Sequence, residues 1–116
     1  MEHRLGTRHA IDLEVYLRTW GSRVLATGRL KDLSVSGAFV TTQLPCRPLL
    51  QVAVQIVPPG QSRRNSIPVQ GQIVRVGEDG IGLEWDELQP QLLTQFVLSH
   101  QDHEQPRTTA TIQRMQ

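Results

Sequence analysis

The sequence predicts one mostly β domain: a small, closed or nearly closed barrel of six short strands with a helix after the last strand. Three observations predict this fold class. Apolar residues alternate with polar ones over several short stretches, as they do in half-buried strands. Turn-forming residues separate these stretches. Beyond residue 87 the apolar spacing changes to three or four residues, which is typical of an amphipathic helix. The 116 residues fit a single domain of this kind.

The strands are expected in the following order. The first covers residues 11–17, where Ile11, Leu13, Val15 and Leu17 alternate with polar residues. Residues 24–30 follow after the turn at Trp20-Gly21-Ser22. The stretch 31–37 has turn chemistry, and the remaining strands are expected at 38–42, 50–56, 67–76 and 81–85. Prolines and glycines between these segments supply the loops.

One apolar stripe marks the helix. Leu88, Leu92, Phe96 and His100 are four residues apart, and Leu93 and Val97 lie beside them. Pro90 suits the first turn, where its missing N–H costs little. We therefore divide the chain into an arm (1–9), a barrel with its helix (10–100) and a polar tail (101–116), and we expect the arm and the tail to be mobile.

Composition excludes several classes of function. The net charge of +1 argues against a coat for nucleic-acid polymers, which needs many phosphate contacts. Aromatic residues make up only 4% of the chain, too few for the stacking platforms of a single-strand-binding barrel. Neither a signal peptide nor a membrane span is evident, so a cytoplasmic protein is expected. Cys46 stands alone and is expected to be inert.

Two short motifs carry the functional information. Arg4-Leu5-Gly6-Thr7-Arg8 is an R-x-x-x-R pattern directly before the first strand. Asp32-Leu33-Ser34-Val35-Ser36-Gly37 is a D-x-S-x-x-G pattern after the second strand. Either motif alone is weak, and their order and placement give them weight.

This arrangement, over residues 3 to 100, resembles the PilZ domain family. The segments 71–76 and 80–85 also look like the closing strands of that family. The resemblance implies a six-stranded antiparallel barrel with a C-terminal α-helix. It implies cyclic di-GMP as the ligand and no cofactor. By motif match it implies the ligand residues Arg4, Arg8, Asp32, Ser34 and Gly37. His3 stands where many members have a further arginine, which leaves the stoichiometry open.

The residue types suit such a ligand. An arginine fork matches O6 and N7 of guanine, binds phosphate bidentately and stacks on bases. Asp32 either accepts from the guanine N1–H and amino group or holds an arginine. Ser34 either donates to phosphate or caps the turn. Gly37 either takes a positive φ or lets the backbone approach the ligand. Arg75 is a further candidate, for stacking on a base.

The expected function is a cyclic di-GMP receptor that changes conformation and signals to a partner protein. The main alternative is an adaptor of the same fold that binds no nucleotide, such as those in type IV pilus assembly. In a plainer interpretation the motifs form only a solvated terminus and a hairpin turn. Trp20 and Trp85 are interpreted as packing residues, with the alternative that one of them lines the ligand site. We expect no enzyme, and His100 and His103 lack the further ligands of a zinc site.

Overall fold

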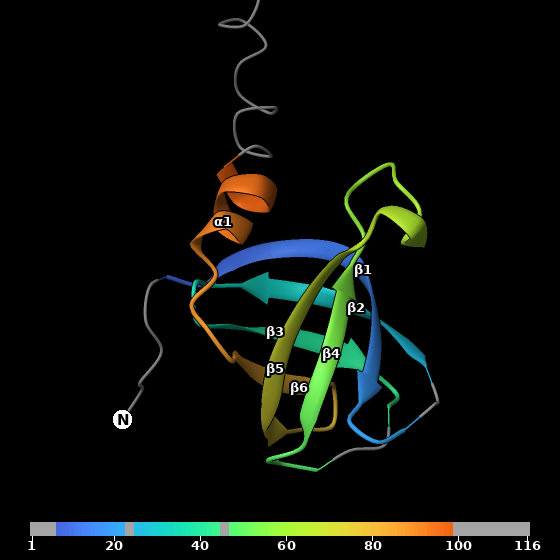
Figure 1. Ribbon diagram of the computed structural model, residues 1–116. Coiled ribbons are helices and arrows are strands. Elements are labelled where there is room, and N and C mark those ends of the chain that lie inside the picture. Colours follow the sequence, from blue (N-terminus) through green and yellow to red (C-terminus); the bar gives the residue numbers. More distant parts are fainter. Residues whose placement is uncertain (1–6, 23–24, 45–46, 99–116) are drawn as a thin grey trace, which may run out of the picture.

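The structure is a computed structural model that describes residues 7–22, 25–44 and 47–98. Within these residues six strands form a closed antiparallel barrel in the order β1-β2-β3-β6-β5-β4 (Figure 1). The strands are β1 (His9–Thr19), β2 (Ala26–Leu33), β3 (Gly37–Thr42), β4 (Gln51–Ile56), β5 (Ile67–Val76) and β6 (Ile81–Trp85). The predicted fold class is confirmed. Expectations for residues 1–6, for residue 24 at the start of the second predicted strand, for Cys46 and for residues 99–116 lie outside the described residues.

The alternation in the sequence explains the core. Leu13, Val15 and Leu17 of β1 point inward and are nearly inaccessible, whereas Asp12 and Arg18 on the other face are exposed. The same period of two places Val52, Val54 and Ile56 of β4 in the core. Because every strand contributes such residues, the barrel interior is filled by Val, Leu and Ile side chains and leaves the outer face for polar groups.

The second strand differs from the prediction. It ends at Leu33 and not at Leu30, because Asp32 and Leu33 pair with Phe39 and Ala38 of β3. A register irregularity between Leu30 and Asp32 interrupts the alternation of apolar and polar residues. The alternation alone therefore did not predict the true end of the strand. The turn is therefore only residues 34–36, and the predicted turn from Lys31 is wrong.

The chain after β6 forms the predicted helix in a shortened form. One α-helical turn, α1 (Pro90–Leu92), continues directly as a π-helical segment, η2 (Leu93–Leu98). Leu92, Phe96 and Val97 are buried against the barrel core, as their spacing predicts. Leu88 was expected to share this stripe, but it precedes the helix and its side chain is 54% exposed. None of the described helices is long and apolar enough to cross a membrane.

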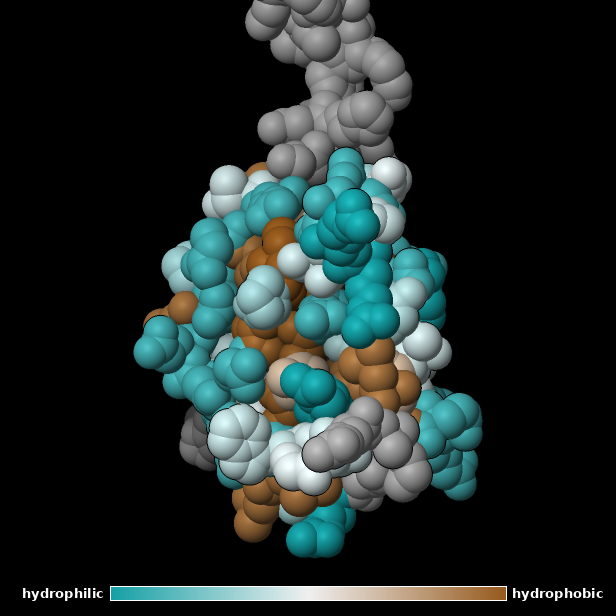
Figure 2. Space-filling view, turned by 45° about the vertical axis from the view of Figure 1, so that its right-hand side comes forward, coloured by the Kyte–Doolittle hydropathy of each residue, from teal (hydrophilic) through white to brown (hydrophobic). Residues whose placement is uncertain are grey.

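Trp85 and Trp20 have opposite environments. Trp85 is 5% exposed and belongs to the core, as expected. Trp20 is 76% exposed at the turn between β1 and β2, so the interpretation of Trp20 as a packing residue is wrong. The view in Figure 2 shows hydrophobic side chains exposed at the lower end of the molecule, away from the helix.

Candidate functional site

The two sequence motifs meet at the end of the barrel where β1 begins and β2 ends. His9 pairs with Leu33 and Ala10 with Asp32, so the backbone register brings Arg8 beside the D-x-S-x-x-G turn. The Arg8 Nη1 group donates a hydrogen bond of 2.6 Å to Oδ1 of Asp32, across 24 residues of sequence. The hairpin topology thus joins a basic and an acidic residue that the sequence alone leaves far apart.

The Arg8–Asp32 ion pair is half-buried and only partly satisfied. The two side chains are 24% and 27% exposed, so solvent still screens the pair. The Arg8 Nε atom is buried and has no hydrogen-bond partner among the described residues. A guanidinium has five donors, and one of them here binds Asp32.

Ser34 and Gly37 hold the turn that presents Asp32. Ser34 is fully buried, and its Oγ accepts hydrogen bonds from the N–H groups of Gly37 at 3.1 Å and Ser36 at 3.3 Å. The backbone N–H of Ser34 also donates to the Gly37 carbonyl at 2.9 Å. In this structure the hydroxyl therefore caps the turn, which is one of the two roles considered for it.

Gly37 has a packing role in addition to the two roles considered for it. Its φ is not in the left-handed region, where the described glycines are Gly21 and Gly60. A Cβ atom on Gly37 would lie 2.0 Å from the backbone carbonyl oxygen of Leu83. The absence of a side chain is what allows β3 to pair with β6 at this point. Of the two roles considered, the positive φ is wrong, and the close approach of a ligand to the backbone stays a prediction.

Arg75 lies in the same cross-strand row as Asp32. Asp32 pairs with Phe39, Phe39 with Gly82, and Gly82 with Arg75. Three strand spacings of about 4.8 Å separate the two ends of the row, roughly 14 Å along the barrel wall. The Arg75 guanidinium covers Gly82, since its Cζ is 3.6 Å from the position of a Cβ there. Arg4, the other predicted arginine, lies outside the described residues.

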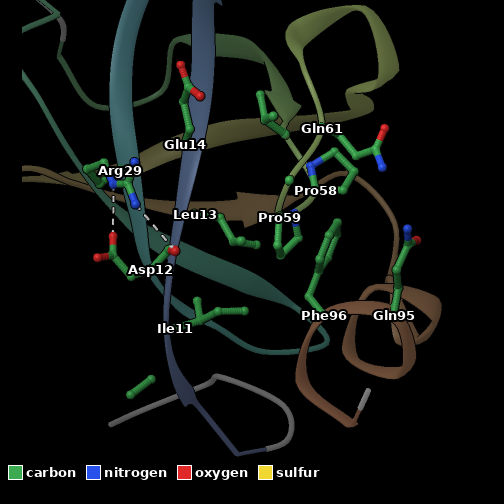
Figure 3. A pocket seen from close by; sticks show the side chains of 13 residues that line it. Ile11, Asp12, Leu13, Glu14, Arg29, Pro58, Pro59, Gln61, Gln95 and Phe96 are labelled. Carbon is green, nitrogen blue, oxygen red and sulfur yellow. Dashed lines mark hydrogen bonds and ion pairs between the residues drawn. The ribbon is translucent and has the colours of Figure 1, made fainter. Parts of the chain in front are cut away.

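A large hollow opens next to this site, between β1, the loop after β4 and the C-terminal helix (Figure 3). Its volume is about 940 Å³. Figure 3 shows Phe96 pointing from the helix toward Pro58 and Pro59, with Ile11 and Leu13 on the β1 side. The sequence reading recognised Pro58-Pro59-Gly60 only as the end of a strand and did not predict this hollow.

The charges around the hollow do not favour an anion. Asp12 and Glu14 line it together with a single arginine, Arg29. Arg29 donates to Asp12 Oδ1 at 2.8 Å, and Lys31 lies 3.5 Å from the same oxygen. The Arg29 hydrogen bond lowers the pKa of Asp12 below its ordinary value. The lining of the hollow therefore carries no excess of positive charge.

Tyr16 is the single tyrosine of the chain, so the titration of its hydroxyl group can be measured without interference from other tyrosines. Its hydroxyl donates to Oε2 of Glu14 at 2.7 Å, and this bond raises the pKa of Tyr16. We expect spectrophotometric titration of the phenolate to give a midpoint above the ordinary value near 10. Glu14→Gln is expected to lower that midpoint. An unchanged midpoint, with circular dichroism showing a folded chain, would contradict the Tyr16–Glu14 hydrogen bond.

Comparisons with known proteins agree with this architecture. The family model described as "PilZ domain" matches residues 2–99. The PilZ domain of CeSA from a cellulose-synthesizing bacterium is 22% identical, with a TM-score of 0.65, covering 82% of this chain and 100% of that one. The Bacillus subtilis inhibitor of motility MotI/DgrA is 13% identical, with a TM-score of 0.63, covering 90% of this chain and 54% of that one. Among proteins with curated functions, none matches.

Proposed function

The chain belongs to the PilZ domain family, and from this premise we propose that it binds cyclic di-GMP and passes the signal to a partner protein. The observation that carries the proposal is the contact between the two motifs. Arg8 and Asp32 are joined at 2.6 Å, and Arg8 Nε is buried without a partner among the described residues. An arginine that Asp32 holds in place presents a fixed positive charge to an anionic guanine ligand.

Arg8 is the centre of the proposed site. Its fork can meet guanine O6 and N7 or a phosphate with two parallel hydrogen bonds. Asp32 acts in one of two ways, either by continuing to hold Arg8 or by accepting from the guanine N1–H and amino group. Ser34 and Gly37 act through the shape of the turn, since the Ser34 side chain is fully buried. Arg75 sits at the far end of the row and is placed to stack on a second base.

The proposed mechanism is a change of conformation without catalysis. The two negative charges of the ligand attract Arg4 to the side of Arg8. This attraction fixes the arm against β2 and β3. A partner that binds this arrangement more tightly than the free form then receives the signal. The proposal places the receptor in the cytoplasm. The partner protein is defined here as one that binds the ligand-bound form of this chain more tightly than the ligand-free form.

Calorimetric titration of the full chain with cyclic di-GMP tests the proposal, with GMP as a control that has one base and one phosphate. We expect saturable binding of cyclic di-GMP and much weaker binding of GMP. At a ligand concentration of about 100 Kd, binding adds about 2.7 kcal/mol to folding stability and raises the unfolding midpoint by several degrees. A flat titration together with an unchanged midpoint would reject the receptor and leave the adaptor of the same fold.

A further inference from the structure

Trp20 is the most exposed large apolar side chain among the described residues, at 76%. It is also held in a defined place. Its backbone N–H donates to the Gln51 carbonyl at 3.0 Å, and Ser22 N–H closes the turn on Thr19 at 3.1 Å. Tryptophan is enriched among the residues that dominate binding at protein interfaces. An exposed tryptophan on a turn with a hydrogen-bonded backbone therefore indicates a contact surface.

The surface beside Trp20 is an amide face, which we define as the outer side chains of Arg18, Trp20, Gln51, Ala53, Gln70, Gln72, Glu84 and Asp86. Backbone register places them in rows: Arg18 pairs with Ala53 and Ala53 with Gln70, while Gln51 pairs with Gln72. Asp86 N–H donates to the Gln70 carbonyl at 3.0 Å and so continues the first row. The middle of the face is uncharged.

The two flanks of the amide face carry opposite charges. Arg18 lies on the β1 flank and has no carboxylate within ion-pair distance in the part of the chain that is described. On the other flank, Glu84 is exposed beside Gln72, and both carboxylate oxygens of Asp86 accept from Gln51 Nε2 at 2.8 Å. A cationic flank, an amide centre and an anionic flank are the pattern that a second identical face can complement.

A hollow in the same face supports this complementarity. It has a volume of about 250 Å³ and lies between Arg18, Trp20, Ala53 and Gln70. The short Ala53 side chain leaves space on the surface beside the longer side chain of Gln70, its partner on the neighbouring strand. When two such faces meet with β4 of one opposite β5 of the other, the Gln70 of each copy enters the hollow over Ala53 of the other. Glutamine amides both donate and accept, so they can pair with themselves.

We propose that the amide face binds a second copy of this chain. The barrel is closed and has no free strand edge, so two copies meet face to face. The symmetry is two-fold, and charge selects the direction of its axis. An axis parallel to β4 and β5 sets Arg18 of each copy opposite Asp86 of the other. An axis across the strands would instead set like flanks against each other. The proposal is independent of the nucleotide.

The size of the face predicts a weak dimer. Its width from β1 to Asp86 is three strand spacings, or roughly 14 Å. A stable interface buries about 1,200 Å² or more in total, and a face of this width falls at or below that limit. We expect a dissociation constant on the order of 100 μM, so the association is concentration-dependent and reversible.

Sedimentation velocity and tryptophan emission of the full chain, from about 10 μM to 1 mM, test the proposal. We expect dimers to form with concentration and the emission to shift to shorter wavelength, since Trp20 is the exposed one of two tryptophans. Arg18→Asp and Asp86→Arg are each expected to weaken self-association at least about tenfold. Mixing the two variants restores dimers, because each introduced charge then meets an opposite one. Arg64→Asp and Asp79→Arg are matched controls outside the face.

Two results would overturn the proposal. One is a wild-type chain that stays monomeric throughout this concentration range. The other is a dimer that forms equally well with Arg18→Asp, Asp86→Arg and Trp20→Ala, because such a dimer uses another surface. Failure of the mixed variants to associate, when each alone is folded and monomeric, would reject the axis and hence the pairing of Arg18 with Asp86.

Discussion

Replacing Arg8 with alanine is expected to weaken cyclic di-GMP binding by about 10- to 100-fold and to leave thermal unfolding nearly unchanged. The loss follows from the fork, because a bidentate arginine contact to guanine is worth about 1–3 kcal/mol. The stability is preserved because the Arg8–Asp32 pair is partly solvated, at 24% and 27% exposure. Solvent-screened ion pairs contribute about 0–1 kcal/mol, and Arg8→Ala also removes a buried Nε that has no partner among the described residues. Calorimetry and thermal unfolding of the same protein samples measure the two effects.

Two further variants separate geometry from charge. Arg8→Lys keeps the positive charge but has no planar fork, so we expect it to recover only part of the lost affinity. Arg64→Ala removes an exposed arginine of the loop between β4 and β5 and is expected to bind like the wild type. If Arg8→Ala and Arg64→Ala lose affinity equally, the effect is general electrostatics and the assignment of Arg8 to the site is wrong.

The fold followed from the sequence wherever the alternation was regular. The alternation over residues 11–17 lies within β1, where Leu13, Val15 and Leu17 point inward, and β4 places Val52, Val54 and Ile56 inward in the same way. The end of β2 was missed because the irregularity between Leu30 and Asp32 breaks the period. Trp20 was missed for another reason. The sequence predicts a turn at residues 20–22, but the hydrophobicity of Trp20 was given more weight than this turn position, which exposes the side chain.

The candidate site was partly predictable for a related reason. Topology puts the start of β1 beside the end of β2, so motifs at those ends had to approach each other. The Asp12–Arg29 ion pair across the same hairpin was not anticipated, although opposite charges on the outer faces of adjacent strands were a usable signal. The burial of Ser34 could not be read from the motif, because Ser in a turn is equally compatible with solvent exposure.

The D-x-S-x-x-G motif combines two physical roles in six residues. Asp32 points outward and holds Arg8, so its contribution is to the proposed ligand site. Ser34 points inward and satisfies the turn, so its contribution is to the fold. Gly37 belongs with Ser34, because the limit on its side chain comes from β6. The two groups of residues should therefore respond differently to mutation.

Gly37→Ala is expected to be the most destabilising single change at the site, by about 3 kcal/mol or more. The added Cβ would lie 2.0 Å from the Leu83 carbonyl oxygen and 3.1 Å from the Leu83 carbonyl carbon, both of them backbone atoms. Relief requires β3 and β6 to separate where Gly37 pairs with Glu84, next to the 2.8 Å hydrogen bond from Trp85 N–H to the Ser36 carbonyl. Thermal unfolding should show a midpoint lowered by more than about 10 °C.

Gly77→Ala is the matched control for this change, because the nearest atom to its added Cβ is 3.8 Å away. We expect it to alter the unfolding midpoint far less. Ligand binding distinguishes the remaining alternative for Gly37. A Gly37→Ala protein that unfolds like the wild type but no longer binds cyclic di-GMP would mean that β3 and β6 tolerate the methyl group and that the ligand does not. The glycine would then be required for the approach of the ligand, and the close contact with Leu83 would be secondary.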